Sequence, residues 1–163
     1  MSAPLGIATT RYTDRTLAAV GAGGNAIPEF AAHDGVCNGG ILFLLPALIA
    51  QGLFKTKEVY DIPQSHYYGL DSVILTLAFM ALARIKNPEQ LKQCKPGEIG
   101  KVLGLDRIPE VRCLREKIKL LSSQNQAQEL NRKLIDYWYQ DTLAEGGQNE
   151  LFLYIDGQDL NRV

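Results

Sequence analysis

The sequence is poor in the residues that build metal sites and disulfide frameworks. Its 163 residues include only three cysteines and two histidines. The cysteines, Cys37, Cys94 and Cys113, are odd in number and widely spaced, which is typical of reduced thiols in a cytosolic protein. Zinc binding by His33, Cys37 and His66 is not expected, because their spacing fits no standard finger. We expect Cys94 and Cys113 to pack on helix faces as small hydrophobes.

Long hydrophobic runs are absent as well. The most apolar stretches, Ile41–Ala50 and Val73–Ala83, are both shorter than the roughly 18–20 apolar residues that a membrane span needs. The amino terminus has no basic region before an apolar core, so no secretory signal is predicted. Gly21–Gly24 lacks the lysine of a phosphate-binding loop, and no Ser-His-Asp or Cys-His arrangement can be assembled. A soluble cytoplasmic domain without membrane contact is the remaining expectation.

An overall excess of one charge is also missing, but the charges are unevenly placed. The net charge is −1 for the whole chain. Between Arg84 and Leu120, ten Lys or Arg stand against five Asp or Glu, a local net charge of +5. Residues 1–83 carry −2 and residues 121–163 carry −4. The basic centre contains Lys95–Leu121, which reads as a short helix, a turn at Gly104 and a longer cationic helix.

Apolar spacing and capping residues predict a mainly α-helical fold with one strand at its end. Asn87 and Pro88 form a helix start signal, and Ser123 with Gln126 fits a capping box. Pro46 predicts either a kink or a helix that starts near it. Two helices are apolar enough to be buried, namely 41–54 and 70–85. The other expected helices cover 12–20, 88–93 and 97–103, a segment that opens at Pro109 and Glu110, and about 123–144.

Two features near the carboxyl end carry separate expectations. Leu151–Ile155 reads as a short strand, and the sequence offers no obvious second strand to pair with it. The aromatic cluster Tyr137, Trp138 and Tyr139 could stack on bases or face a partner, but such clusters more often belong to the core with one edge wet. We therefore expect a core position for the three rings.

Several blocks of the sequence resemble DDE-type transposases of bacterial insertion sequences. TDRTLAAVG (13–21) and GGILFLLPALIAQGLF (39–54) are similar to the amino-terminal helical region of that family. GEIGKVLGLDRIPEVRCLREKI (97–118) resembles its most specific stretch, and LFLYIDG (151–157) resembles the first strand of its catalytic domain. The order and spacing of the blocks agree with the family as well.

The resemblance implies a DNA-binding helical region followed by a ribonuclease-H-like domain. The first strand of that domain ends in an Asp that holds catalytic Mg²⁺, and Asp156 is the position that matches. Gln158 departs from the family, which usually has His there, and the partner carboxylates would lie farther downstream. We therefore expect Asp156 to be a vestigial ligand, the chain to be inactive alone and without cofactor, and a truncation to fall at 158–163. The expected divisions are 1–86 (amino-terminal helices), 87–122 (DNA-binding segment), 123–149 (linker helix) and 150–163 (first catalytic strand).

The residues alone do not separate DNA binding from a plain surface hairpin. A basic helix-turn-helix grips phosphates and reads a groove, but +5 is a modest charge and Arg112–Glu116 could simply decorate a solvated face. The resemblance favours double-stranded DNA as the partner and a nucleoid-associated bacterial location. The alternative is a non-enzymatic interaction module that associates with an intact transposase or with its own copies. The side chains expected to contact DNA are Lys101, Arg107, Arg112, Arg115 and Lys119.

Overall fold

The protein is mainly α-helical in the part of the chain that the structure describes. A computed structural model describes residues 38–63, 67–105 and 107–144, with positions 13, 16, 17, 20, 22–26 and 36 nearer the amino terminus. These residues contain α-helices and short 3₁₀ helices (η) but no strand. Within the same ranges, no helix combines the length and the apolar character that crossing a membrane requires. The elements in chain order are η1 (Gly39–Phe43), α2 (Leu45–Ala50), η2 (Leu53–Glu58), α3 (Leu70–Leu82), η3 (Pro88–Gln93), α4 (Pro96–Val102), α5 (Val111–Ser123) and α6 (Ala127–Ala144).

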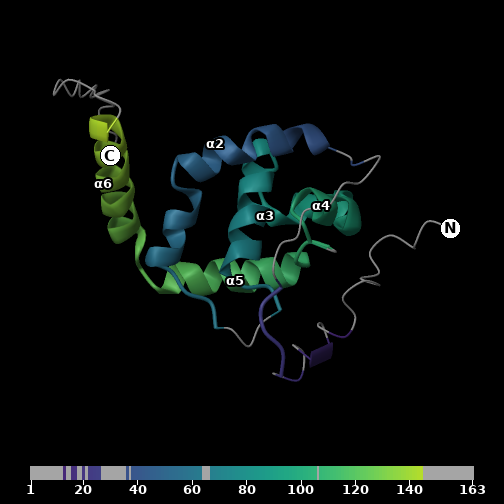
Figure 1. Cartoon of the computed structure of the whole chain (residues 1–163). Coiled ribbons are helices and arrows are strands. Elements are labelled where there is room, and N and C mark those ends of the chain that lie inside the picture. Colours follow the sequence, from purple (N-terminus) through teal and green to yellow (C-terminus); the bar gives the residue numbers. More distant parts are fainter. Residues whose placement is uncertain are drawn as a thin grey trace, which may run out of the picture.

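Helix α3 forms the centre of the core. It runs through the middle of the molecule, with α2 and α5 at its two ends in the view of Figure 1. Nine of its 13 residues are buried, which confirms the predicted buried helix. Two of the nine are polar, and both are satisfied: the hydroxyl of Thr76 donates to the Ser72 carbonyl at 2.7 Å, and that of Ser72 to the Ala26 carbonyl at 3.4 Å. These two hydroxyls are therefore buried in the core with hydrogen-bond acceptors for both of them.

A single buried helix over residues 41–54 is not found, whereas the expected alternative, a helix that starts near Pro46, is confirmed by α2. The segment is broken into η1, α2 and η2, and Leu45 is the only residue of the three helices that is buried. Pro46 lies in the first turn of α2, where its missing N–H costs nothing, as expected from its position. Gly52, at φ 92°, lies between α2 and η2 and separates these two helices. Because the pieces are short and lie at the surface, apolar side chains such as Phe43 (88% exposed) face solvent.

Residues of α4, of α5 and of the connection between them belong to the same apolar core as α3. Val102, Ile108 and Leu114 are almost fully buried together with the apolar residues of α3. The predicted apolar stripe of α5 is confirmed, since its members Val111, Leu114, Ile118 and Leu121 all pack there. Helix α5 also contacts η3.

The predicted start of η3 is correct. The side chain of Asn87 accepts a hydrogen bond from the Gln90 N–H at 3.2 Å, and Pro88 follows at the first helical position. The segment is a 3₁₀ helix rather than an α-helix. An Asn cap satisfies one of the amides that a helix start leaves without an internal partner.

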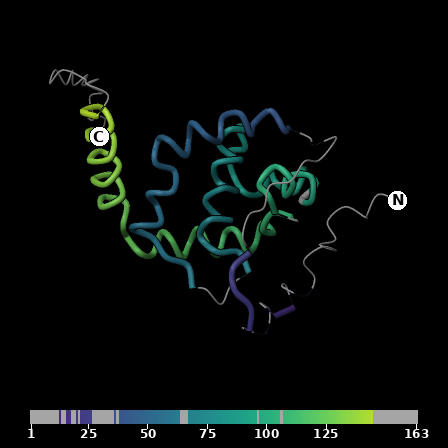
Figure 2. Tube along the Cα trace, viewed as in Figure 1, coloured from purple at the N-terminus to yellow at the C-terminus, as the bar shows by residue number. Residues whose placement is uncertain are grey.

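Helix α6 stands apart from the core and contacts η2 (Figure 2). The predicted capping box is wrong, because Ser123 is the last residue of α5 and its hydroxyl donates to the Leu120 carbonyl at 2.7 Å. None of the α6 residues is buried, so the expected core position of its aromatic cluster is also wrong. Tyr137 and Trp138 instead attach the helix by hydrogen bonds to the carbonyls of Ala50 (2.8 Å) and Gln51 (2.9 Å).

Two sequence expectations fall mainly or wholly on residues outside the described part. These are the helix over 12–20, of which only isolated positions are described, and the strand over 151–155.

Truncating Leu114 tests the shared core. Leu114 is 0% exposed, so Leu114→Ala is expected to lower the free energy of unfolding by about 3 kcal/mol through lost burial and a residual cavity. Urea denaturation followed by circular dichroism measures the change. Leu143→Ala on exposed α6 is the matched control, with an expected change below about 0.5 kcal/mol. Equal effects of the two substitutions would contradict the placement of the core.

Candidate nucleic-acid interface

A close approach of two backbone segments fixes the connection between α4 and α5. Gly104, at φ 67°, ends α4, and the N–H of Leu105 donates back to the Gly100 carbonyl at 2.8 Å. The N–H of Gly104 also donates to the Lys101 carbonyl at 3.3 Å, which completes a Schellman motif. A Cβ atom on Gly100 would lie 2.5 Å from the Cα of Arg107. Glycine is therefore required at 100, and the predicted turn at Gly104 is confirmed.

Tyr68 also holds the connection between α4 and α5, by hydrogen bonds to its backbone. The hydroxyl of Tyr68, which is itself buried, lies 3.2 Å from the carbonyl oxygens of both Arg107 and Ile108 and donates to them. Pro109 is also fully buried. Core contacts on both sides thus determine where α5 begins and in which direction it leaves.

Helix α5 begins slightly later than the sequence predicted. Glu110 is its N-cap, with ψ 150°, and Val111 is the first helical residue. Pro109 therefore precedes the cap instead of opening the helix, and its ring packs into the core. The side chain of Glu110 forms no capping hydrogen bond with the backbone N–H groups in the first turn of α5.

The five cations predicted to contact DNA occupy two kinds of environment. Arg112 (side chain 91% exposed), Arg115 (68% exposed) and Lys119 are exposed and follow one another at spacings of three and four residues, so they share the outer face of α5. Lys101 on α4 and Arg107 in the connection are partly covered, and their charged groups lie 3.4 Å from Glu98 and 3.8 Å from Glu110. The structure therefore brings three of the five together.

Acidic side chains partly neutralise this outer face. Arg112 pairs with Glu116 and Arg115 pairs with Glu89 of η3, each at 3.1 Å. The pKa of Glu89 is lowered by a hydrogen bond from Lys92 and, to a smaller extent, by Arg115. Lys119 has no carboxylate partner among the described residues. Ion pairs that are exposed to water in this way are weak, because solvent screens both charges.

One cation of the basic segment is not available to a partner. Lys117 lies on the inner face of α5 and is 6% exposed. Burial lowers its pKa, an effect that nearby Cys113 and Glu116 partly offset. The sequence did contain a signal, because Lys117 falls three residues after Leu114 and four before Leu121, within the apolar stripe. The accessible positive charge is thus smaller than the count of Lys and Arg suggests.

The described cysteines are half-buried, as the sequence predicted. Cys94 and Cys113 both pack against the core, and burial raises the pKa of the Cys113 thiol. Within the described ranges, no group of three or more His, Cys, Asp or Glu side chains could hold a metal ion. His33, Cys37, His66 and the expected magnesium ligand Asp156 lie outside these ranges.

The family of the chain follows from its sequence as a whole. A protein-family model described as "Transposase protein" matches residues 6–161. The chain belongs to this transposase family. No curated protein and no solved structure matches it significantly. The matched residues include α4, the connection and α5.

Adding a methyl group at Gly100 tests the close approach that orients α5. Gly100→Ala is expected to lower the free energy of unfolding by about 2–3 kcal/mol, because the new Cβ meets backbone atoms that cannot rotate away. Gly40→Ala in η1 is the control, since a Cβ there meets nothing within 4 Å. Urea unfolding of both variants measures the difference. A neutral Gly100→Ala would mean that the connection is not packed on α4.

The buried Lys117 gives the protein a pH-dependent stability term. Its lowered pKa means that the unfolded state binds this proton more strongly, so stability rises with pH up to the ordinary lysine pKa of about 10.4. Lys117→Met is expected to stabilise the fold at neutral pH by about 1 kcal/mol, with a gain that shrinks at high pH. Urea unfolding at pH 7 and pH 10 measures it. Exposed Lys119→Met should show no such pattern, and a pH-independent gain for Lys117→Met would contradict the assignment.

Proposed function

We propose that this transposase chain binds double-stranded DNA through the outer face of α5, as the amino-terminal part of a DDE-type transposase of a bacterial insertion sequence. The observation that carries the proposal is the placement of Arg112, Arg115 and Lys119 on one exposed face of a helix whose start is fixed by the core. In this proposal α3 and η3 support α5, and α4 with the connection forms the first part of a helix-turn-helix.

The dimensions of α5 suit a DNA groove. Its 13 residues correspond to a length of about 20 Å, and the major groove of B-DNA is about 12 Å wide and admits an α-helix. Arginine side chains on such a helix can hydrogen-bond guanine edges with two donors, or they can bind phosphates. The first-turn amides of α5 add donors for a phosphate at its amino-terminal end.

The charges on this face can be rearranged on binding. Arg112 and Arg115 are held by Glu116 and Glu89, both of which are exposed, so the carboxylates remain hydrated when the arginines move to phosphates. Lys119 requires no such exchange. We infer that the three side chains contribute most of the salt-dependent affinity, with Lys101 and Arg107 in a smaller role.

The catalytic part of the resemblance stays a separate expectation. In DDE-type enzymes the residue that matches Asp156 would hold Mg²⁺ for strand cleavage and joining. The DNA-binding proposal does not depend on that residue. A location with the bacterial nucleoid follows if the chain binds DNA as proposed.

A second candidate function is an interaction module that associates with an intact transposase. The specific observation in its favour is the set of large apolar side chains that α6 leaves exposed. They are Ile135, Trp138, Tyr139 and Leu143.

Salt-dependent DNA binding tests the first proposal. Arg112→Ala with Arg115→Ala is expected to weaken binding about tenfold or more, and to reduce the slope of log K against log salt by about 1 for each lost phosphate contact. The probes are a duplex with the terminal repeats of the element that encodes this chain and an unrelated duplex of equal length. Fluorescence anisotropy over a series of KCl concentrations gives both quantities.

Arg132→Ala with Lys133→Ala is the matched control. These residues also lie on an exposed helix and pair with carboxylates, Glu129 and Glu58, but they belong to α6. The control is expected to leave the affinity nearly unchanged. Undetectable binding of the unmodified chain at low salt would overturn DNA binding and favour the interaction module, as would equal losses in both double variants.

A further inference from the structure

The carboxylate of Glu89 joins two cations that come from different helices. Glu89 lies in the first turn of η3, and its Oε2 pairs with Lys92 in the last turn of the same helix. Its Oε1 lies 3.1 Å from a guanidinium nitrogen of Arg115 on α5. The hydrogen bond from Lys92 lowers the pKa of Glu89, and the charges of both cations lower it further. One anionic group is therefore already bound between η3 and α5.

Helix η3 has a fixed position beside α5. Leu91 is buried in the apolar core, and η3 contacts α5. A reciprocal pair of hydrogen bonds fixes the start of η3. The Asn87 side chain accepts from the Gln90 N–H at 3.2 Å, and the Gln90 side chain accepts from the Lys86 N–H at 2.7 Å. The backbone that carries Lys92 is consequently anchored next to the outer face of α5.

All three charged side chains can be reached from solvent. The side chains of Lys92 and Arg115 are 66% and 68% exposed, and that of Glu89 is 46% exposed. Ion pairs that water reaches in this way are weak, since solvent screens both charges. An anion from outside the chain can therefore reach the two cations when the carboxylate turns away from them.

We propose that Lys92 and Arg115 form a subsite for a backbone phosphate of DNA, and that Glu89 occupies this subsite in the free protein. A phosphate group has several charged oxygens, so it can accept from an ammonium and a guanidinium together, as the carboxylate does. Arg115 lies on the outer face of α5, so the subsite is continuous with the surface proposed to bind DNA. The inference rests on that proposed function and extends the interface from α5 onto η3.

In this proposal Glu89 opposes DNA binding more strongly than Glu116 does. Within the described part of the chain, Glu116 pairs with one cation, Arg112. Displacement of Glu89 releases two cations, Lys92 and Arg115, whereas displacement of Glu116 releases one. Its carboxylate also competes for the position that the phosphate would take. Neutralising Glu89 therefore exposes a complete phosphate subsite.

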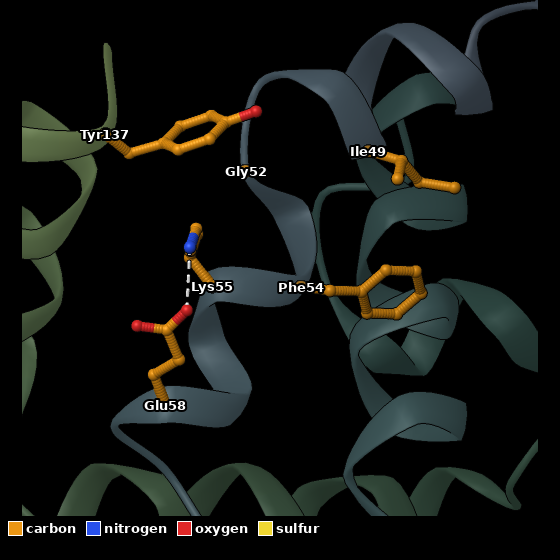
Figure 3. A pocket seen from close by; sticks show the side chains of 6 residues that line it. All are labelled: Ile49, Gly52, Phe54, Lys55, Glu58 and Tyr137. Carbon is orange, nitrogen blue, oxygen red and sulfur yellow. Dashed lines mark hydrogen bonds and ion pairs between the residues drawn. The ribbon is translucent and has the colours of Figure 1, made fainter. Parts of the chain in front are cut away.

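The first test neutralises Glu89. With the terminal-repeat duplex, Glu89→Gln is expected to strengthen binding about threefold to fivefold, because a carboxylate no longer competes with the phosphate for the two cations. Glu58→Gln is the matched control. Glu58 also joins two cations, Lys55 at 2.8 Å and Lys133 at 3.2 Å, but it lies between η2 and α6, and Figure 3 shows its pair with Lys55. The control changes the net charge equally and is expected to leave the affinity nearly unchanged.

The second test removes Lys92. Lys92→Ala is expected to weaken binding about threefold to tenfold and to reduce the slope of log K against log salt by about 1. Both effects should be the same for the terminal-repeat duplex and the unrelated duplex, since a phosphate contact carries no sequence information. Lys57→Ala is the control, because Lys57 is also an exposed lysine of a 3₁₀ helix and pairs with Asp71 at 3.0 Å. It should change neither quantity.

Fluorescence anisotropy over a KCl series measures all four variants, and circular dichroism checks that they keep their helices. Binding that is weakened by Arg112→Ala with Arg115→Ala but unaffected by Glu89→Gln and Lys92→Ala would overturn the subsite and leave the proposed function in place. Equal gains from Glu89→Gln and Glu58→Gln would also overturn it, since net charge alone would then explain the effect. If the unmodified chain binds no DNA at low salt, both proposals fail.

Discussion

The direction of α5 depends on the contact between the Gly100 backbone and the chain that returns over it. At Gly100 the two segments meet through backbone atoms, since a Cβ there would lie 2.5 Å from the Cα of Arg107 and 2.8 Å from the carbonyl oxygen of Leu105. The hydrogen bonds from Leu105 to Gly100 and from Tyr68 to the following carbonyls preserve this contact from opposite sides. This contact, together with the burial of Pro109 and Leu114, gives the outer face of α5 a defined position.

One cation of the basic segment is buried and others are exposed. Lys117 lies inside and lowers the positive charge that a partner can meet, whereas Arg112, Arg115 and Lys119 remain outside. The acidic neighbours Glu89 and Glu116 reduce the positive potential of this face, because each forms an ion pair with one of the two arginines. In the proposed DNA complex, long-range electrostatic attraction to this face is therefore moderate, because salt and the two carboxylates both screen its charge.

The sequence predicted those features that depend on local rules. The burial of α3, the stripe of α5, the Asn87 cap and the turn at Gly104 each follow from spacing or from one residue's conformational preference. The sequence-based prediction was wrong where the structure depends on contacts between residues far apart in the chain or on how a segment is interrupted. Ser123 looked like a cap but donates backwards within α5, and residues 41–54 were apolar enough for burial but too broken by Pro46 and Gly52 to form one helix. The placement of α6 beside the Gly52 turn carried no local signal.

Helices α5 and α6 differ in how extensively they pack against the rest of the protein. Leu114 of α5 and Val73 of α3 are fully buried in the same apolar cluster, so a movement of α5 would require opening the core. Helix α6 is attached to the end of α2 and the Gly52 turn by Leu134 and by two hydrogen bonds from aromatic side chains, and to η2 by the ion pair of Lys133 with Glu58. None of its residues is buried. Such a helix can change partners at little cost to the fold. The rigid face of α5 agrees with the proposed DNA binding, and the exposed apolar side chains of α6 agree with the second candidate function, association with another protein.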